Sequence, residues 1–154
     1  MVTDLSAYLD RSDKFYFINV TTGGYGITSD AKNGSQEYLC ALLNSHLIDF
    51  FFKRTATTFR SGYFAANKQF IEILPIHPIN FSNPADKSRH DQMVELVERM
   101  LDLNKRLQKA ITAHEKDSLQ RQIDATDRQI DRLVYDLYEL TDAEIKIIEG
   151  SADK

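Results

Sequence analysis

Mostly apolar residues recur at alternating spacings of three and four over two stretches in the second half of the chain. They are Met93, Leu96, Met100, Leu103, Leu107 and Ala110, then Leu119, Ile123, Thr126, Ile130, Leu133, Leu137 and Leu140. This spacing places each set along one side of a helix, as in the seam of a coiled coil. The pattern predicts two antiparallel helices of roughly 25 residues each, joined near residues 112–116.

Capping signals support the ends of these helices. Thr112 and Glu115 have the spacing of a capping box, and they lie between the two apolar sets. Thr141 and Glu144 repeat this spacing, so we expect a last short helix over residues 143–149 that Gly150 ends.

The first half of the chain mixes helical and extended patterns. Residues 15–20 (FYFINV) are aromatic and β-branched, and we expect them to pair as a hairpin with residues 25–28. Residues 36–53 have helical spacing with a broad apolar face, and Ser35 can cap this helix. After a loop or edge strand over residues 55–60, the pattern favours a short strand over residues 62–65 and a turn of helix over residues 68–71, capped by Asn67.

These elements together predict an α+β protein. A small mixed α/β half over residues 1–80 is followed by a linker at residues 81–85, where prolines and asparagines cluster. Residues 86–150 are expected to form a long antiparallel helical hairpin, similar to a coiled coil, with the short terminal helix.

Composition narrows the class of protein. The chain has 154 residues, of which 42% are hydrophobic, and this is typical of a globular domain. No apolar run is long enough to cross a membrane and no secretory signal is visible. The single cysteine, Cys40, excludes a disulfide framework, and its apolar surroundings favour a buried, inert thiol.

A search for catalytic motifs returns none. The chain has no phosphate-binding glycine loop, and residues 23–26 (GGYG) are better explained as a turn. The four histidines, His46, His77, His90 and His114, are scattered without metal-ligand spacing, and we expect them at the surface or in the linker. The sequence therefore predicts neither an active site nor a metal site.

One stretch stands out by its charge. Between Asp49 and Glu72 there is no acidic residue, although the whole chain has a net charge of −4. The stretch contains Lys53, Arg54, Arg60 and Lys68 among hydroxyl and amide side chains. Such side chains contact phosphates and base edges in nucleic-acid complexes. A basic surface without a ligand is the alternative interpretation.

Three passages of the chain also resemble a known family. Residues 37–53, residues 62–76 and residues 130–149 are similar, in order and spacing, to the TaqI-like C-terminal specificity region of restriction–modification adenine methyltransferases. The family includes type IIG enzymes, which combine nuclease, methyltransferase and target recognition in one chain. Residues 1–33 match it more loosely. The signatures of the methyltransferase (Asn-Pro-Pro-Tyr) and of the nuclease are absent from this sequence.

The resemblance implies a DNA sequence-specificity module in the cytoplasm that is not an enzyme by itself. Residues 1–80 would be the C-terminal part of a target recognition domain, so the chain would be a fragment or a short subunit. Its partners would be double-stranded DNA and a methyltransferase or nuclease domain or subunit. S-adenosylmethionine would bind in that associated domain, and no cofactor is expected in this chain.

The same resemblance makes the acid-free stretch the expected DNA-contact region. Its candidate residues are Lys53, Arg54, Arg60, Tyr63, Asn67, Lys68 and Gln69. Lys53, Arg54 and Arg60 are expected at phosphates, whereas Asn67, Lys68 and Gln69 could contact base edges, as could Arg60. The alternative interpretation is an interaction module in which the coiled-coil-like hairpin joins two copies of the chain without binding DNA.

Overall fold

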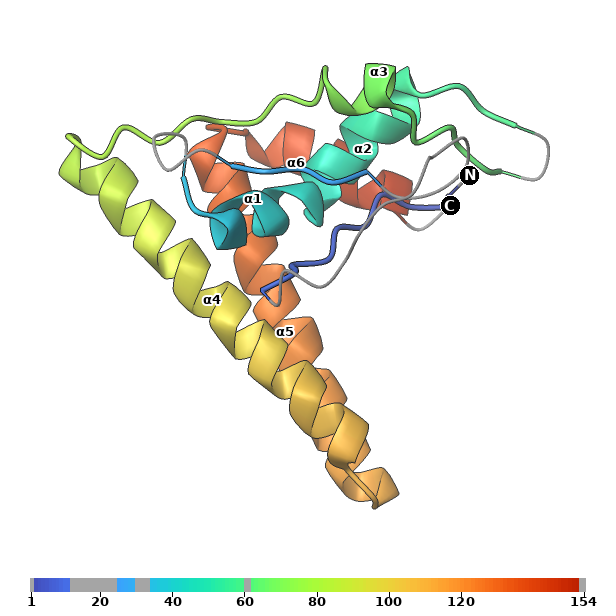
Figure 1. The fold of residues 1–154 in the computed structure, drawn as a ribbon, viewed down its shortest axis with the longest axis vertical. Helices are drawn as coiled ribbons and strands as arrows, with labels where there is room; N and C mark the ends of the chain where they lie inside the picture. Colours follow the sequence, from blue (N-terminus) through green and yellow to red (C-terminus); the bar gives the residue numbers. More distant parts are fainter. Residues whose placement is uncertain (1, 12–24, 30–33, 60–61, 153–154) are drawn as a thin grey trace.

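The protein is all-helical in the part of the chain that the structure describes. The computed structural model describes residues 2–11, 25–29, 34–59 and 62–152. Six helices follow one another along these residues (Figure 1): α1 (Gln36–Leu43), α2 (His46–Thr55), α3 (Lys68–Ile71), α4 (Pro84–Lys109), α5 (Ala113–Leu137) and α6 (Asp142–Ala152). None of these helices is both long and apolar enough to span a bilayer.

The prediction of an α+β fold with a mixed α/β half is therefore wrong. The described residues contain no sheet. Phe64 makes single antiparallel pairings with Val2 and with Thr58, and residues 25–28 form no strand. The predicted strand over residues 15–20 lies outside the described residues.

Side chains of the helices take the place of neighbouring strands at the extended segments. The backbone N–H groups of Leu5 and Ala7 donate to Asp49 Oδ1 at 2.8 Å and to Asn44 Oδ1 at 2.9 Å. The Asn44 amide donates in return to the Ala7 carbonyl at 3.0 Å. Backbone polar groups must find partners when they leave water, but these partners need not be another strand. Extended sequence therefore does not produce a sheet here.

Two tyrosine side chains also hydrogen-bond the backbone of the segment after α3. Tyr38 Oη donates to the His77 carbonyl at 2.9 Å, and Tyr138 Oη accepts from the His77 N–H at 3.1 Å. Tyr138 Oη also hydrogen-bonds the Pro75 carbonyl. Tyr38 belongs to α1 and Tyr138 caps the end of α5, so residues 75–77 join α1 to the end of α5.

The helix predicted over residues 36–53 is interrupted at Asn44 and Ser45. Ser35 caps α1 as predicted, since its side chain accepts from the Tyr38 N–H. Ser45 starts a new helix, because its Oγ accepts from the Ile48 N–H and donates to the Leu42 carbonyl at 2.7 Å. A serine that bonds local backbone groups favours a cap over a helix interior.

The predicted helical hairpin is present. Asn83 and Pro84 begin α4, and Thr112 caps α5 by accepting from the Glu115 N–H at 3.2 Å. The two helices lie side by side near their connection and separate towards the other end (Figure 1). Near the connection, Leu103, Ala110 and Leu119 form a small core of their own.

Helix α1 fills the space where the two hairpin helices separate. Its residues Tyr38, Ala41 and Leu42 share one core with Met93 and Val97 of α4 and with Ile130, Val134 and Leu137 of α5. The heptad seam therefore packs helix against helix near the connection, and farther along both helices share their core with α1.

A second core lies on the other side of α2. It is formed by Leu43, Ile48, Phe52, Ala56 and Leu74.

The capping box at Thr141 forms as predicted, with Glu144 Oε2 accepting from the Thr141 N–H at 2.8 Å. The helix that follows, α6, continues through Gly150 to Ala152, so the prediction that Gly150 ends it is wrong. A single glycine costs a helix only about 1 kcal/mol, which does not by itself end it.

Replacing Leu42 by alanine should destabilise the protein strongly. Leu42 is fully buried between α1 and the hairpin. The truncation leaves a cavity in the shared core, so we expect a loss of about 2–5 kcal/mol in the free energy of unfolding. Urea denaturation followed by circular dichroism measures it. The matched control is Ile111→Ala at the hairpin connection, where the side chain is 90% exposed and the change should stay within about 0.5 kcal/mol. Equal losses in both variants would contradict the shared core.

Candidate functional site

The residues predicted to contact DNA lie together at the end of the molecule remote from the hairpin connection. Lys53 and Arg54 are in the last turn of α2, Tyr63 is in the loop that follows, and Asn67 begins α3 (Figure 1). Lys68 and Gln69 are in α3 itself. Arg60 lies outside the described residues.

Most of these side chains reach the solvent. Arg54, Asn67, Lys68 and Gln69 are exposed, and Tyr63 is 42% exposed. Asn67 occupies the cap position of α3 without making the predicted side-chain cap bond, so its amide is not used there. The region is therefore an open surface and is not covered by the hairpin.

The Arg54 guanidinium lies over an aromatic ring of its own helix. Its Cζ atom is 4.2 Å from the centroid of the Phe50 ring. Stacking uses the flat face of a guanidinium, so the N–H groups at its edge can still donate to an anion. Arg54 is thus held in one place with its donors available.

Two of the cations have carboxylate partners in space, although the sequence around them lacks acids. Lys53 Nζ is 2.6 Å from Asp4 Oδ1 and 2.7 Å from Asp49 Oδ2. Its side chain is only 27% exposed, so this pairing holds the N-terminal segment on α2. Lys68 Nζ is 3.0 Å from Glu72 Oε1, but both side chains are well exposed, and such a surface pair contributes little.

Between α2 and α3, residues 57–59 pair with residues 63–65 as a short antiparallel ribbon, and residues 60–61 lie outside the described residues. The Ala65 N–H donates to the Thr57 carbonyl at 3.0 Å, and the Phe59 N–H donates to the Tyr63 carbonyl at 2.7 Å. Gly62 has a φ of +75°, a backbone conformation that suits glycine. The ribbon exposes Phe59, which is not among the residues predicted to contact DNA.

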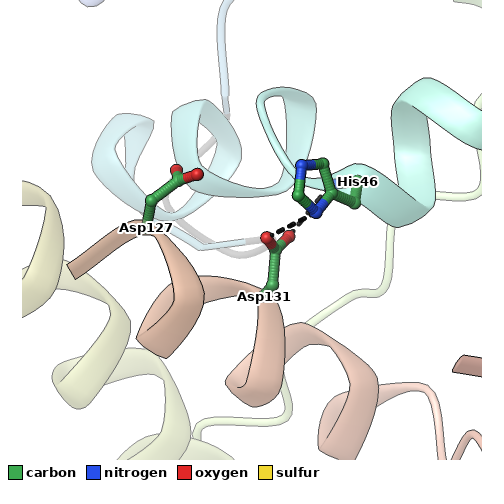
Figure 2. A group of neighbouring side chains, drawn as sticks. All are labelled: His46, Asp127 and Asp131. Atoms are coloured by element: carbon green, nitrogen blue, oxygen red, sulfur yellow. Dashed lines mark hydrogen bonds and ion pairs between the residues drawn. The ribbon is translucent and has the colours of Figure 1, made fainter. Parts of the chain in front are cut away.

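A second cluster, also missed from the sequence, joins α2 to α5. Figure 2 shows His46, the first residue of α2, beside Asp131 and Asp127 of α5. His46 Nδ1 is 2.9 Å from Asp131 Oδ2, and the His46 N–H donates to Asp131 Oδ1 at 2.9 Å. The spacing of Asp127 and Asp131 is visible in the sequence, but their contact with a residue about 80 positions earlier is not.

The electrostatics of this cluster favour an anchor over a metal centre. Both oxygens of the buried Asp131 carboxylate already accept from His46. The hydrogen bond to Asp131 raises the pKa of His46, and burial with the neighbouring Asp131 charge raises the pKa of Asp127. Among the described residues, these three have ligand atoms within 4.8 Å of one another, as a divalent ion requires. Metal binding there would break the His46–Asp131 bond.

Cys40 has the properties of a structural thiol. Burial raises the pKa of its Sγ, which disfavours the thiolate. The thiol lies 3.8 Å from the Ala7 carbonyl, where it can act as a weak donor. Cys40 is half-buried, so the prediction of a buried thiol is wrong in that respect, and its inert role stays a prediction.

Comparison with known proteins finds a family model that matches a little under half of the chain. Residues 6–76 match the model of the TaqI-like C-terminal specificity domain. The match contains α1, α2, the ribbon and α3, and it ends before the hairpin. No curated protein and no solved structure matches the chain. The resemblance stated from the sequence is thus confirmed for residues 6–76.

The His46–Asp131 bond should make stability depend on pH. Because the folded pKa of His46 is raised above its ordinary value of about 6.5, the bond contributes fully below that pH. The contribution disappears as the pH rises through the raised pKa. Urea denaturation between about pH 5 and pH 8 should show wild type losing stability relative to His46→Gln as the pH rises. His114→Gln, a change at an exposed histidine, should keep the wild-type dependence. An unchanged difference between wild type and His46→Gln across this range would refute the anchor.

Proposed function

We infer, from the TaqI-like C-terminal specificity domain that residues 6–76 match, that this chain is a DNA sequence-specificity module of a restriction–modification adenine methyltransferase. It binds duplex DNA and positions it for catalytic domains elsewhere. By itself it is not an enzyme. S-adenosylmethionine binds in the associated methyltransferase domain, and the assembly works in the cytoplasm.

The family match carries this proposal, and the chemistry of the exposed surface supports it. Arg54 and Lys68 supply cations for phosphate contacts, and Asn67 and Gln69 supply amides that can hydrogen-bond base edges. Lys53 is a weaker phosphate ligand than its charge suggests, because DNA must compete with Asp4 and Asp49 for its ammonium group. Arg54 is the stronger candidate, because none of the ion pairs among the described residues includes its guanidinium group.

The helical hairpin serves as the contact with the catalytic partner in this proposal. Its seam is occupied by its own core and by α1. Across residues 84–137, all of which the structure describes, Ile111 is the large apolar side chain that is exposed. Pairing of two copies through a coiled-coil seam needs a continuous apolar stripe. The DNA-specificity interpretation is therefore favoured over a dimerisation module.

Binding to duplex DNA should be steeply dependent on salt, and Arg54 should contribute one contact. Each phosphate contact adds about −0.9 to the slope of log K against log salt. Titrations of labelled duplexes at several salt concentrations should show this slope for wild type. Arg54→Ala should weaken binding to all sequences alike and reduce the steepness by about one contact.

The control for Arg54 is a cation at the far end of the molecule. Lys109→Ala, in the last turn of α4, should leave both affinity and slope unchanged. No affinity for duplex DNA at low salt, with the methyltransferase domain supplied as well as without it, would reject the proposed function.

Arg60 should behave differently from Arg54 if it reads a base. Arg60→Ala should then cost about 1–3 kcal/mol on the preferred duplex and relax the preference at one base pair. Binding to a panel of single-base variants of that duplex measures this change. A uniform loss across the panel, like that expected for Arg54→Ala, would assign Arg60 to a phosphate.

A further inference from the structure

We propose that the end of the helical hairpin, residues 105–116, is the docking surface for the catalytic partner, and that this partner presents an apolar pocket bordered by carboxylates. The inference rests on the proposed function, in which the hairpin contacts that partner. It adds where on the hairpin the contact lies and which chemistry the partner needs. Ile111 is the apolar anchor of the surface, and the cations around it form the rim.

The hairpin end is the part of the two long helices that stands clear of the other helices. The connection between α4 and α5 lies apart from them, whereas farther along both helices share a core with α1 (Figure 1). All residues of the range 111–118 are exposed. A partner can therefore reach this end without displacing another element of the described chain.

Ile111 is the most exposed large apolar side chain among the described residues, at 90%. It lies between two helix ends that are each held in place. On one side, Ala110 packs with Leu103 and Leu119 in the small core of the hairpin. On the other side, the Thr112 side chain caps α5. The backbone that carries Ile111 is thus ordered before a partner binds, which lowers the entropy cost of docking.

A single exposed isoleucine is ordinary on a protein surface, but the charges around this one are unevenly placed. Residues 105–116 carry four cations and one carboxylate, a net charge of +3. The rest of the two helices, residues 84–104 and 117–137, has a net charge of −4. The cations are Lys105, Arg106, Lys109 and Lys116. Positive charge is therefore concentrated at the end that exposes Ile111.

Most of these cations are available to an external carboxylate. Of the four, Arg106 alone takes part in an ion pair among the described residues, at 3.6 Å from Asp102. Both side chains of that pair are well exposed, and such a surface pair contributes little. The three lysines are exposed as well. An acidic partner surface would pair with them and speed association by electrostatic attraction.

A protein partner fits this end better than a nucleic acid or a second copy does. An apolar centre inside a polar rim is the anatomy of a protein–protein interface. The sugar–phosphate backbone of DNA would satisfy the cations but offers no apolar pocket for Ile111. The candidates for DNA contact in α2 and α3 also lie at the opposite end of the molecule (Figure 1). Two hairpin ends facing each other would repel, because like charges would meet.

The test measures binding of the full chain to a separately expressed methyltransferase domain of the same restriction–modification system. Ile111→Asp removes the anchor, and Lys105→Glu combined with Lys116→Glu reverses part of the rim. The matched control combines Arg99→Glu with Arg132→Glu, which makes the same change in net charge at exposed cations away from the hairpin end. Association and dissociation rates are recorded at several salt concentrations, and duplex DNA is titrated in parallel.

We expect Ile111→Asp to weaken binding to the domain about tenfold or more, mainly through faster dissociation, as loss of a central anchor does. The double lysine variant should associate more slowly and show a weaker dependence on salt. The control should bind the domain as wild type does. None of these changes should alter the affinity for duplex DNA, because charges at this distance are screened.

Three outcomes would overturn this inference while the proposed function stands. They are wild-type binding of the domain by the hairpin-end variants, equal losses in these variants and the control, and binding of duplex DNA by wild type without any binding of the domain. A loss of duplex affinity in the hairpin-end variants alone would assign this end to DNA and would also overturn it. No affinity of wild type for duplex DNA, with or without the domain, would instead reject the proposed function.

Discussion

Pairing of the backbone in the extended segments is the constraint on which the rest of the structure depends. These partly exposed segments lie against the helices without forming a sheet, and their N–H and carbonyl groups find partners in side chains. Asn44 and Asp49 bind residues 5–7, and Tyr38 and Tyr138 bind residues 75–77. The interruption between α1 and α2 places the Asn44 amide beside the N-terminal segment, where it can bond to the backbone of that segment. The same contacts hold the segment that carries Val2, on which the ribbon is seated.

The shared core gives this arrangement its stiffness. Because α1 packs between α4 and α5, the hairpin and the first half of the chain cannot move apart without exposing Tyr38 and Leu42. The His46–Asp131 pair adds a second link from α2 to α5. A surface that recognises DNA at one end and a hairpin that contacts a catalytic partner at the other would thus be held at a fixed separation, as positioning of a target base requires.

Charge along the chain and charge in space differ at this surface. The interval without acids suggested several free cations, but Asp4 and Asp49 meet Lys53, and Glu72 meets Lys68. Arg54 differs because its partner is the Phe50 ring, which does not neutralise it. The exposed Phe59 adds an apolar side chain that a search for cations does not detect. Recognition by such a surface would combine a few phosphate contacts with contacts to base edges.

The sequence by itself determined the local features of this protein: the two long helices, their capping residues and the resemblance of residues 6–76 to the matched family. These depend on periodicity and on neighbours within a few positions, which a sequence displays directly. Only the tertiary structure decided that extended segments would bond to helix side chains instead of to one another, and that His46 would meet Asp131. Each of these depends on which distant groups come close enough to replace water, and spacing along the chain does not specify this.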